Sequence, residues 1–179
     1  MDTFDEFVKR VVKALNKSGF EYAITGALAV SYYGRPRTTM DMDVLIKVNI
    51  QDIPSLTETL VKAGLEADVR SIESAWSSRY RIATVNDKKS PHTLDVILRS
   101  DEIDRRRGLI LDIPCFYEAP GSLILAKLRM MKATTQPERF IVDKEDVKAI
   151  LKHTRIETWS LEEKAKEQGT YPLLKQLET

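Results

Sequence analysis

The sequence predicts an α/β (α+β) fold, in which a short mixed β-sheet with flanking helices is followed by a helical C-terminal part. Up to about residue 118, segments rich in strand-favouring residues alternate with amphipathic helical segments. After Ala119-Pro120 the strand signals stop and only helical periodicity continues. We therefore expect a core over residues 1–117 and a helical region over residues 118–179.

Composition limits the classes of protein that this chain can belong to. Of its 179 residues, 42% are hydrophobic and 31% charged, which suits one folded domain with a small appendage. A net charge of +1 argues against a protein that coats nucleic acid by charge alone. The single cysteine, Cys115, excludes an internal disulfide and predicts a buried, inert thiol. With no signal-peptide pattern and no membrane-length apolar run, we expect a cytoplasmic protein without a membrane partner.

The first half of the core begins with a clearly delimited helix. Thr3 and Glu6 have the spacing of a capping box, an apolar stripe follows at helical intervals, and Ser18-Gly19 ends the helix. The elements expected next are a strand at 20–25, a short helix at 27–33 that Gly34 cuts, and a strand at 40–48.

The second half of the core is less regular. Asp52 and Pro54 start a helix that Gly64 stops, and the segment 68–78 is ambiguous. We expect strands at 79–85 and 92–98, a solvated helical turn at 102–107 that includes the run Arg105–Arg107, and a strand region at 108–117 that Pro114 bends. The helical region is expected to hold segments near 121–132, 142–153 and 159–168, and a short one after Pro172.

Two acids on one predicted strand are the first candidate site. Because side chains alternate between the faces of a strand, Asp41 and Asp43 project the same way. Their mutual repulsion needs a raised pKa, a nearby base or a bound cation. Mg²⁺ prefers such oxygen ligands together with substrate phosphates, so the pair suits a magnesium and nucleotide site. A lone Asp-x-Asp is also common on strand ends for solubility alone.

The turn before this strand suits an anion. A strand that ends at Gly26 and opens a helix leaves backbone N–H groups free, and these attract phosphate. Gly26 and the small Ala27 allow a bulky ligand to approach the backbone. Arg37 supplies a forked cation for a phosphate.

These residues carry a resemblance to a known superfamily. A Gly-small pair, a spacer, and Asp-x-Asp on a strand resemble the signature of the DNA polymerase beta-like nucleotidyltransferases. The run 34–39, GRPRTT, is similar to the small prokaryotic branch that includes the AbiEii-type and minimal nucleotidyltransferases. The family usually has Gly-Gly or Gly-Ser where this chain has Gly26-Ala27, so any phosphate contact from a serine hydroxyl is missing while backbone contacts are kept.

The resemblance implies a set of site residues. A third carboxylate is required on a neighbouring strand, and Asp95, at the centre of the predicted strand 92–98, is the candidate. Asp41, Asp43 and Asp95 would then be catalytic and hold Mg²⁺, with Asp95 assisting deprotonation of the attacking hydroxyl. Gly26 and Ala27 would bind the nucleotide triphosphate, together with Arg37 and Lys127.

Lys127 is unusual because it is centred on an apolar helical face, where an unpaired ammonium is costly. Asp143 and Asp146 lie on the apolar stripe of the next predicted helix, and the segment resembles a Lys-Asp-x-x-Asp region of the same branch. We expect Lys127 to pair with phosphate or with one of these acids; the alternative is a lysine that reaches past the apolar face into solvent.

The function implied is Mg²⁺-dependent transfer of a nucleoside monophosphate from an NTP such as ATP to a hydroxyl on an RNA end, a protein or a small molecule, in a toxin–antitoxin context that includes a partner protein. Three alternatives stay open. One is a degenerate nucleotide-binding or antitoxin-like regulatory module, which Ala27 favours. The others are an interaction protein with acids only on its surface, and a phosphotransferase on the same fold.

Overall fold

The computed structural model describes residues 1–178, which divide into two compact units. The first unit contains residues 1–28 and 38–118, and the second contains residues 29–37 together with the chain from Ala119 onward. The second unit thus takes a short segment from the middle of the N-terminal half, in addition to the C-terminal helices. Across residues 1–178, every helix is too short or too polar to cross a bilayer.

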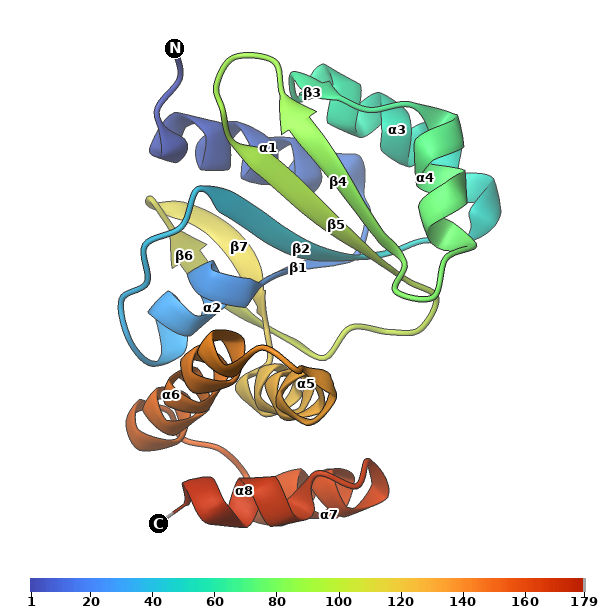
Figure 1. Cartoon of the computed structure of the whole chain (residues 1–179). Coiled ribbons are helices and arrows are strands. Elements are labelled where there is room, and N and C mark those ends of the chain that lie inside the picture. Colours follow the sequence, from blue (N-terminus) through green and yellow to red (C-terminus); the bar gives the residue numbers. More distant parts are fainter. Residues whose placement is uncertain (179) are drawn as a thin grey trace. The chain divides into compact units, whose positions relative to one another are not determined.

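The first unit is built on one mixed sheet (Figure 1), as the sequence predicts. Its seven strands lie in the order β3-β4-β5-β2-β1-β7-β6. The pairs β2/β5 and β1/β7 are parallel and the others antiparallel. The strands are β1 (Tyr22–Thr25), β2 (Asp41–Lys47), β3 (Leu65–Glu66), β4 (Ile82–Asp87), β5 (Thr93–Arg99), β6 (Arg105–Ile110) and β7 (Ile113–Glu118).

Helices α1 (Phe4–Ser18), α3 (Ile53–Lys62) and α4 (Val69–Trp76) pack with this sheet to make the core. The unit also contains the start of α2 (Gly26–Tyr33) and the single turn η1 (Ile50–Asp52). The predicted capping box of α1 is present, since the Thr3 side chain accepts from the Glu6 N–H and the Glu6 carboxylate accepts from the Thr3 N–H. Gly19, with φ of 78°, ends that helix.

The face of the sheet that packs against α1 is apolar. Met42, Val44 and Ile46 of β2 are fully buried, whereas the alternate residues of that strand include the acids. His92, which shares the face of Leu94 on β5, packs its ring 5.5 Å from that of Phe7 on α1. The α1 side of the sheet is therefore the core, and Asp41 and Asp43 project from the opposite face.

Two sequence-based expectations in this unit are wrong. The segment 102–107, expected to form a helical turn, contains the start of β6, which pairs with β7 in a hairpin closed by Leu111 and Asp112 at φ of 49° and 65°. The arginine run is thus part of a strand, and the Arg105 guanidinium stacks 3.8 Å from the centre of the Phe116 ring. The strand expected at 79–85 begins only at Ile82, because Arg81 has a φ of 51°, which a strand does not allow.

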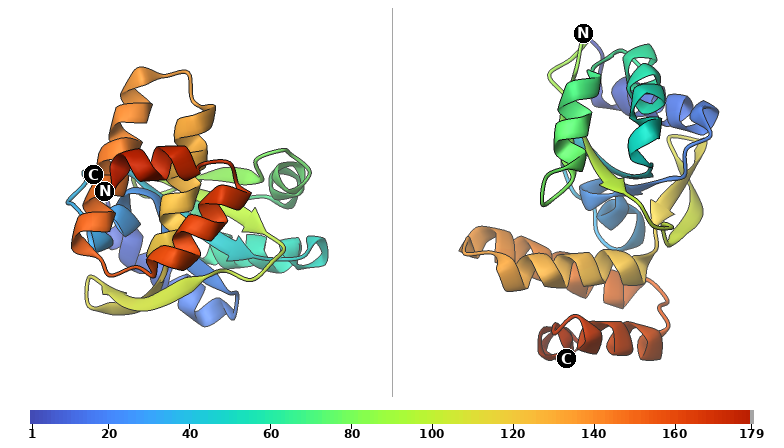
Figure 2. Two further views of the ribbon diagram at one scale, coloured as in Figure 1. Left: turned by 90° about the horizontal axis from the view of Figure 1, so that it is seen from below. Right: turned by 90° about the vertical axis from the view of Figure 1, so that its right-hand side faces the viewer.

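The second unit consists of helices. They are α5 (Pro120–Ala133), α6 (Pro137–His153), α7 (Thr158–Glu167) and α8 (Tyr171–Leu177), close to the predicted segments, together with the end of α2. Joined by a short loop, α5 and α6 lie alongside each other (Figure 2). Gly34 follows α2 where a Cβ would lie 2.9 Å from the backbone nitrogen of Ile150, so only glycine allows this approach to α6.

Candidate active site

Strand register brings the three predicted carboxylates to one face of two neighbouring strands. Asp43 on β2 is the direct partner of Asp95 on the parallel strand β5. Asp41 lies two residues earlier on β2, about 6.6 Å along the strand and on the same face. Asp43 and Asp95 are half-buried and Asp41 is exposed. The three acids singled out in the sequence thus belong to one surface of the first unit.

A polar row extends this surface across the sheet. Thr25 on β1 is the partner of Asp43, and Thr84 on β4 is the partner of Asp95. At the end of β7, Glu118 accepts a hydrogen bond of 2.5 Å from the Thr25 hydroxyl, and both side chains are buried, at 6% exposure. Sequence reasoning missed Glu118; the only available signal was a single acid at the end of an apolar strand.

Threonine hydroxyls hold two of the carboxylates in place. Thr93 donates to Asp41 Oδ1 at 2.8 Å, and Thr84 donates to Asp95 Oδ1 at 2.5 Å. Across residues 1–178, no three Asp, Glu, His or Cys side chains form a group arranged to hold a metal ion. The donor type nevertheless fits a hard divalent cation, because all three groups are carboxylates that project from one face of the sheet.

Gly26 adjoins this surface at the turn from β1 into α2. Its φ is +62°, a conformation that side-chain-bearing residues rarely adopt. A Cβ at this position would overlap the carboxylate of Asp43. Glycine is therefore required for the backbone geometry and to make room for the acid. Ala27, the next residue, lies in the first turn of α2 and is half-buried.

The remaining predicted residues, Arg37 and Lys127, belong to the second unit and meet at Asp146. Lys127 Nζ lies 2.9 Å from Asp146 Oδ2 and 2.8 Å from Asp143 Oδ1. Arg37 Nη1 lies 2.5 Å from Asp146 Oδ2, and Arg35 Nη2 lies 3.0 Å from Asp146 Oδ1. The expected pairing of Lys127 with an acid of the next helix is confirmed, and its side chain is only 12% exposed.

Burial and charge act in opposite directions on Asp146. Burial would raise the pKa of this fully buried carboxyl, and the ammonium of Lys127 and the guanidinium of Arg37 outweigh it, so the pKa lies below its ordinary value. Within residues 1–178, Oδ2 of Asp143 is buried without a hydrogen-bond partner. The three cations of this cluster outnumber its two carboxylates, which leaves a positive charge that an anion can neutralise.

Solved structures share this fold, although the sequence itself matches no family model and no curated protein. The solution structure of the antibiotic-resistance factor ANT(2'')-Ia has a TM-score of 0.65 at 13% identity, covering 96% of this chain and 95% of the other. A crystal structure of ANT(2'')-Ia in complex with adenylyl-2''-tobramycin has a TM-score of 0.58 at 11% identity, covering 80% and 86%.

An antigenic nucleotidyltransferase-like protein from Paracoccidioides brasiliensis has a TM-score of 0.56 at 17% identity, covering 82% of this chain and 75% of the other. These structural neighbours are nucleotidyltransferases and nucleotidyltransferase-like proteins, and the chain has their fold. The expected AbiEii-type branch is not among them.

Proposed function

We propose that the protein is a nucleotidyltransferase, which moves a nucleoside monophosphate from an NTP to a hydroxyl acceptor. The observation that carries the proposal is the register that pairs Asp43 with Asp95, with Asp41 on the same face and Gly26 leaving room for Asp43. The fold shared with nucleotidyltransferases supports it. Fold alone does not specify chemistry, so the weight rests on these residues.

In this reaction the acceptor oxygen attacks the α-phosphorus, the bond to the pyrophosphate breaks, and the acceptor proton must go to a base. Asp95 takes that proton on Oδ2, because the Thr84 hydroxyl donates its hydrogen bond to Oδ1. The backbone at Gly26 and Ala27 binds the triphosphate at the start of α2. Positioning and electrostatics supply most of the rate in such a site.

Asp41, Asp43 and Asp95 are the residues that would hold Mg²⁺. A bound divalent ion lowers the pKa of an acceptor hydroxyl and stabilises the charge on a leaving pyrophosphate. Thr93 and Thr84 orient two of these carboxylates from outside the ligand set, which is the role that supporting hydrogen bonds play around metal ligands. Taken by itself, the second unit carries a surplus positive charge on Arg35, Arg37 and Lys127 that suits an anionic group such as a phosphate.

The acceptor is one of an RNA end, a protein hydroxyl or a small molecule. Adenylyl-2''-tobramycin, bound in one structural neighbour, is an adenylyl group carried by a small molecule, which places small-molecule hydroxyls first among those to be tried. A toxin–antitoxin setting belongs to the same proposal. It predicts that expression of the wild type arrests bacterial growth and that expression of Asp43→Asn does not.

A nucleotide-binding module without turnover is the second candidate. Ala27 favours it, because a serine at this position would supply a hydroxyl for a phosphate and alanine cannot. The two candidates differ in one measurable respect: the module binds NTP but releases no pyrophosphate in the presence of any acceptor.

The experiment is a transfer assay with each NTP labelled at the α-phosphate, Mg²⁺, and pools of RNA, protein and small hydroxyl compounds. We expect label on an acceptor and release of pyrophosphate, and loss of both in Asp43→Asn. Release of ADP in place of pyrophosphate would indicate a phosphotransferase. Transfer retained at the wild-type rate in Asp43→Asn would overturn this assignment of the site.

A further inference from the structure

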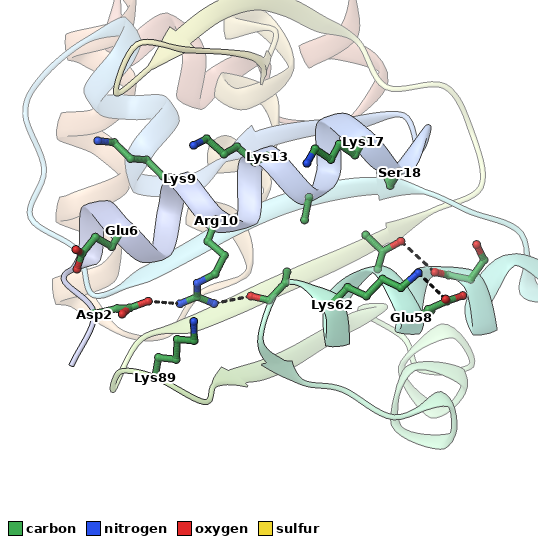
Figure 3. A pocket seen from close by; sticks show the side chains of 14 residues that line it. Asp2, Glu6, Lys9, Arg10, Lys13, Lys17, Ser18, Glu58, Lys62 and Lys89 are labelled. Carbon is green, nitrogen blue, oxygen red and sulfur yellow. Dashed lines mark hydrogen bonds and ion pairs between the residues drawn. The ribbon is translucent and has the colours of Figure 1, made fainter.

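A groove on the first unit carries charge that the proposed reaction does not use. It has a volume of about 810 Å³ and lies between α1 and α3, with Lys89 at one end (Figure 3). Since α1 packs on the apolar face of the sheet, this groove is on the opposite side of the sheet from Asp41 and Asp43. It is therefore a separate surface from the candidate active site.

Positive charge dominates the walls of this groove. Six cationic and three acidic side chains line it. Each acid already has a partner: Asp2 contacts Arg10 at 2.9 Å, Glu58 contacts Lys62 at 2.7 Å, and Glu6 caps α1. The four remaining lysines make no ion pair within residues 1–178; they are Lys9, Lys13, Lys17 and Lys89.

Three of these lysines form a row. Lys9, Lys13 and Lys17 are four residues apart, so they recur on one face of α1 about every 6 Å and extend over about 12 Å. Figure 3 shows them one after another along the helix. A compact anion is held by cations that converge on a point, whereas charges arranged in a line match a chain of phosphates.

The rest of the lining lacks two kinds of side chain that recognise bases. Small side chains lie between the lysines on the two helices: Ala14, Ser18, Ser55, Thr59 and Ala63. No aromatic side chain lines the groove for a base to stack on, and no Asn or Gln lines it to read a base edge. The lining thus offers neither base stacking nor the amide contacts that read adenine, and its predominant charge favours phosphate contacts.

The groove has a rigid base. Arg10 Nη1 donates to the carbonyl of Ala63, and both of its terminal nitrogens donate to Asp87 at 3.0 Å. Arg10 thus ties α1 to the end of α3 and to β4. The charge of Arg10 is neutralised within the protein by Asp2 and Asp87, so the row of lysines supplies the charge that can bind a ligand.

We propose that this groove binds a single strand of nucleic acid through its phosphates and independently of base sequence. The binding requires neither Mg²⁺ nor transfer activity, so this proposal can be tested independently of the proposed reaction. Four lysine–phosphate contacts predict a slope of about −2.8 for log K against log salt, which is about a 50-fold loss of affinity between 50 and 200 mM salt.

The test is fluorescence anisotropy with a labelled 12-nucleotide RNA in EDTA, at both salt concentrations. Lys9→Gln/Lys13→Gln/Lys17→Gln keeps one contact, so its affinity should fall only about threefold between those salt concentrations. The matched control is Lys144→Gln/Lys148→Gln/Lys152→Gln, which removes three lysines at the same spacing from α6 of the second unit and should behave as the wild type.

Four outcomes would overturn the proposal. The first is absence of wild-type binding at 50 mM salt, and the second is equal loss in both triple variants, which would indicate net charge alone. The third is competition by ATP at the same concentration as the RNA, which would make the groove a site for a compact anion. A peptide nucleic acid of the same sequence, whose backbone has no phosphates, should not bind, and its binding would also contradict the phosphate contacts.

Discussion

Replacing Gly26 with alanine tests how the turn into α2 and the acid on β2 depend on each other. The substitution adds a Cβ at a φ of +62°, where its backbone conformation is unfavourable, and directs that Cβ into the carboxylate of Asp43. Gly19→Ala is the matched control, because Gly19 has a φ of +78° and nothing within 4 Å of the added Cβ. The difference between the two variants isolates the overlap with Asp43.

The expected magnitudes follow from these two contributions. The left-handed backbone alone should lower the free energy of unfolding by about 1–2 kcal/mol in Gly19→Ala. Gly26→Ala should lose this amount and, in addition, about 1–3 kcal/mol for the overlap. In an Asp43→Ala background the overlapping carboxylate is gone and only the Asp43 Cβ is left at 3.0 Å, so most of the additional loss should disappear.

Urea unfolding is the assay, followed by the fluorescence of Trp76 in a Trp159→Phe background. Trp159 belongs to the second unit and is 73% exposed, so its replacement leaves a single tryptophan that reports on the first unit. Equal losses in Gly26→Ala and Gly19→Ala, or no coupling between Gly26 and Asp43, would refute the reasoning.

Three further predictions concern buried ionisable groups. Because Lys127 and its neighbours lower the pKa of Asp146 in the folded protein, its stabilisation is full above about pH 4 and is lost as the pH falls through that lowered pKa. Asp146→Asn should therefore cost about 3–5 kcal/mol at pH 7 and less at pH 3 in urea titrations, and equal costs at the two pH values would contradict this. Burial by itself would raise the pKa of Asp87, and Arg10 helps to hold it below its ordinary value. Arg10→Met leaves this buried carboxylate without its cation, so the free energy of unfolding should fall by about 3–5 kcal/mol at pH 7. An unchanged midpoint of unfolding would contradict the role of this ion pair. Burial raises the pKa of the Cys115 thiol to about 11, so a thiol reagent at pH 8 should label it only after unfolding, and rapid labelling of the native protein would contradict its burial.

Local signals in the sequence were sufficient for elements whose geometry is set nearby. The capping box at Thr3 and Glu6, and the alternation of acids with apolar residues in β2, each gave the correct element. The arginine run at 105–107 did not, because its strand forms through pairing with β7 and stacking of Arg105 on Phe116, neither of which is visible locally.

For the candidate site, the residue types were predictable and their arrangement was not. Asp-x-Asp on a strand implies a shared face, but only the register shows that Asp95 lies directly beside Asp43. The buried Glu118 and the threonines that orient the carboxylates come from strands whose neighbours the sequence does not specify. Lys127 was recognisable because a cation on an apolar face needs a partner, and Asp146 supplies it.

Calorimetric titration of the four NTPs with Mg²⁺ tests the central claim most directly, on the wild type and on Asp41→Asn/Asp43→Asn. Our account predicts Mg²⁺-dependent binding of at least one NTP to the wild type, and its loss in the double variant with folding unchanged. Failure of a well-folded wild type to bind any NTP, or equal binding by the double variant, would contradict the assignment of these acids to a nucleotide site.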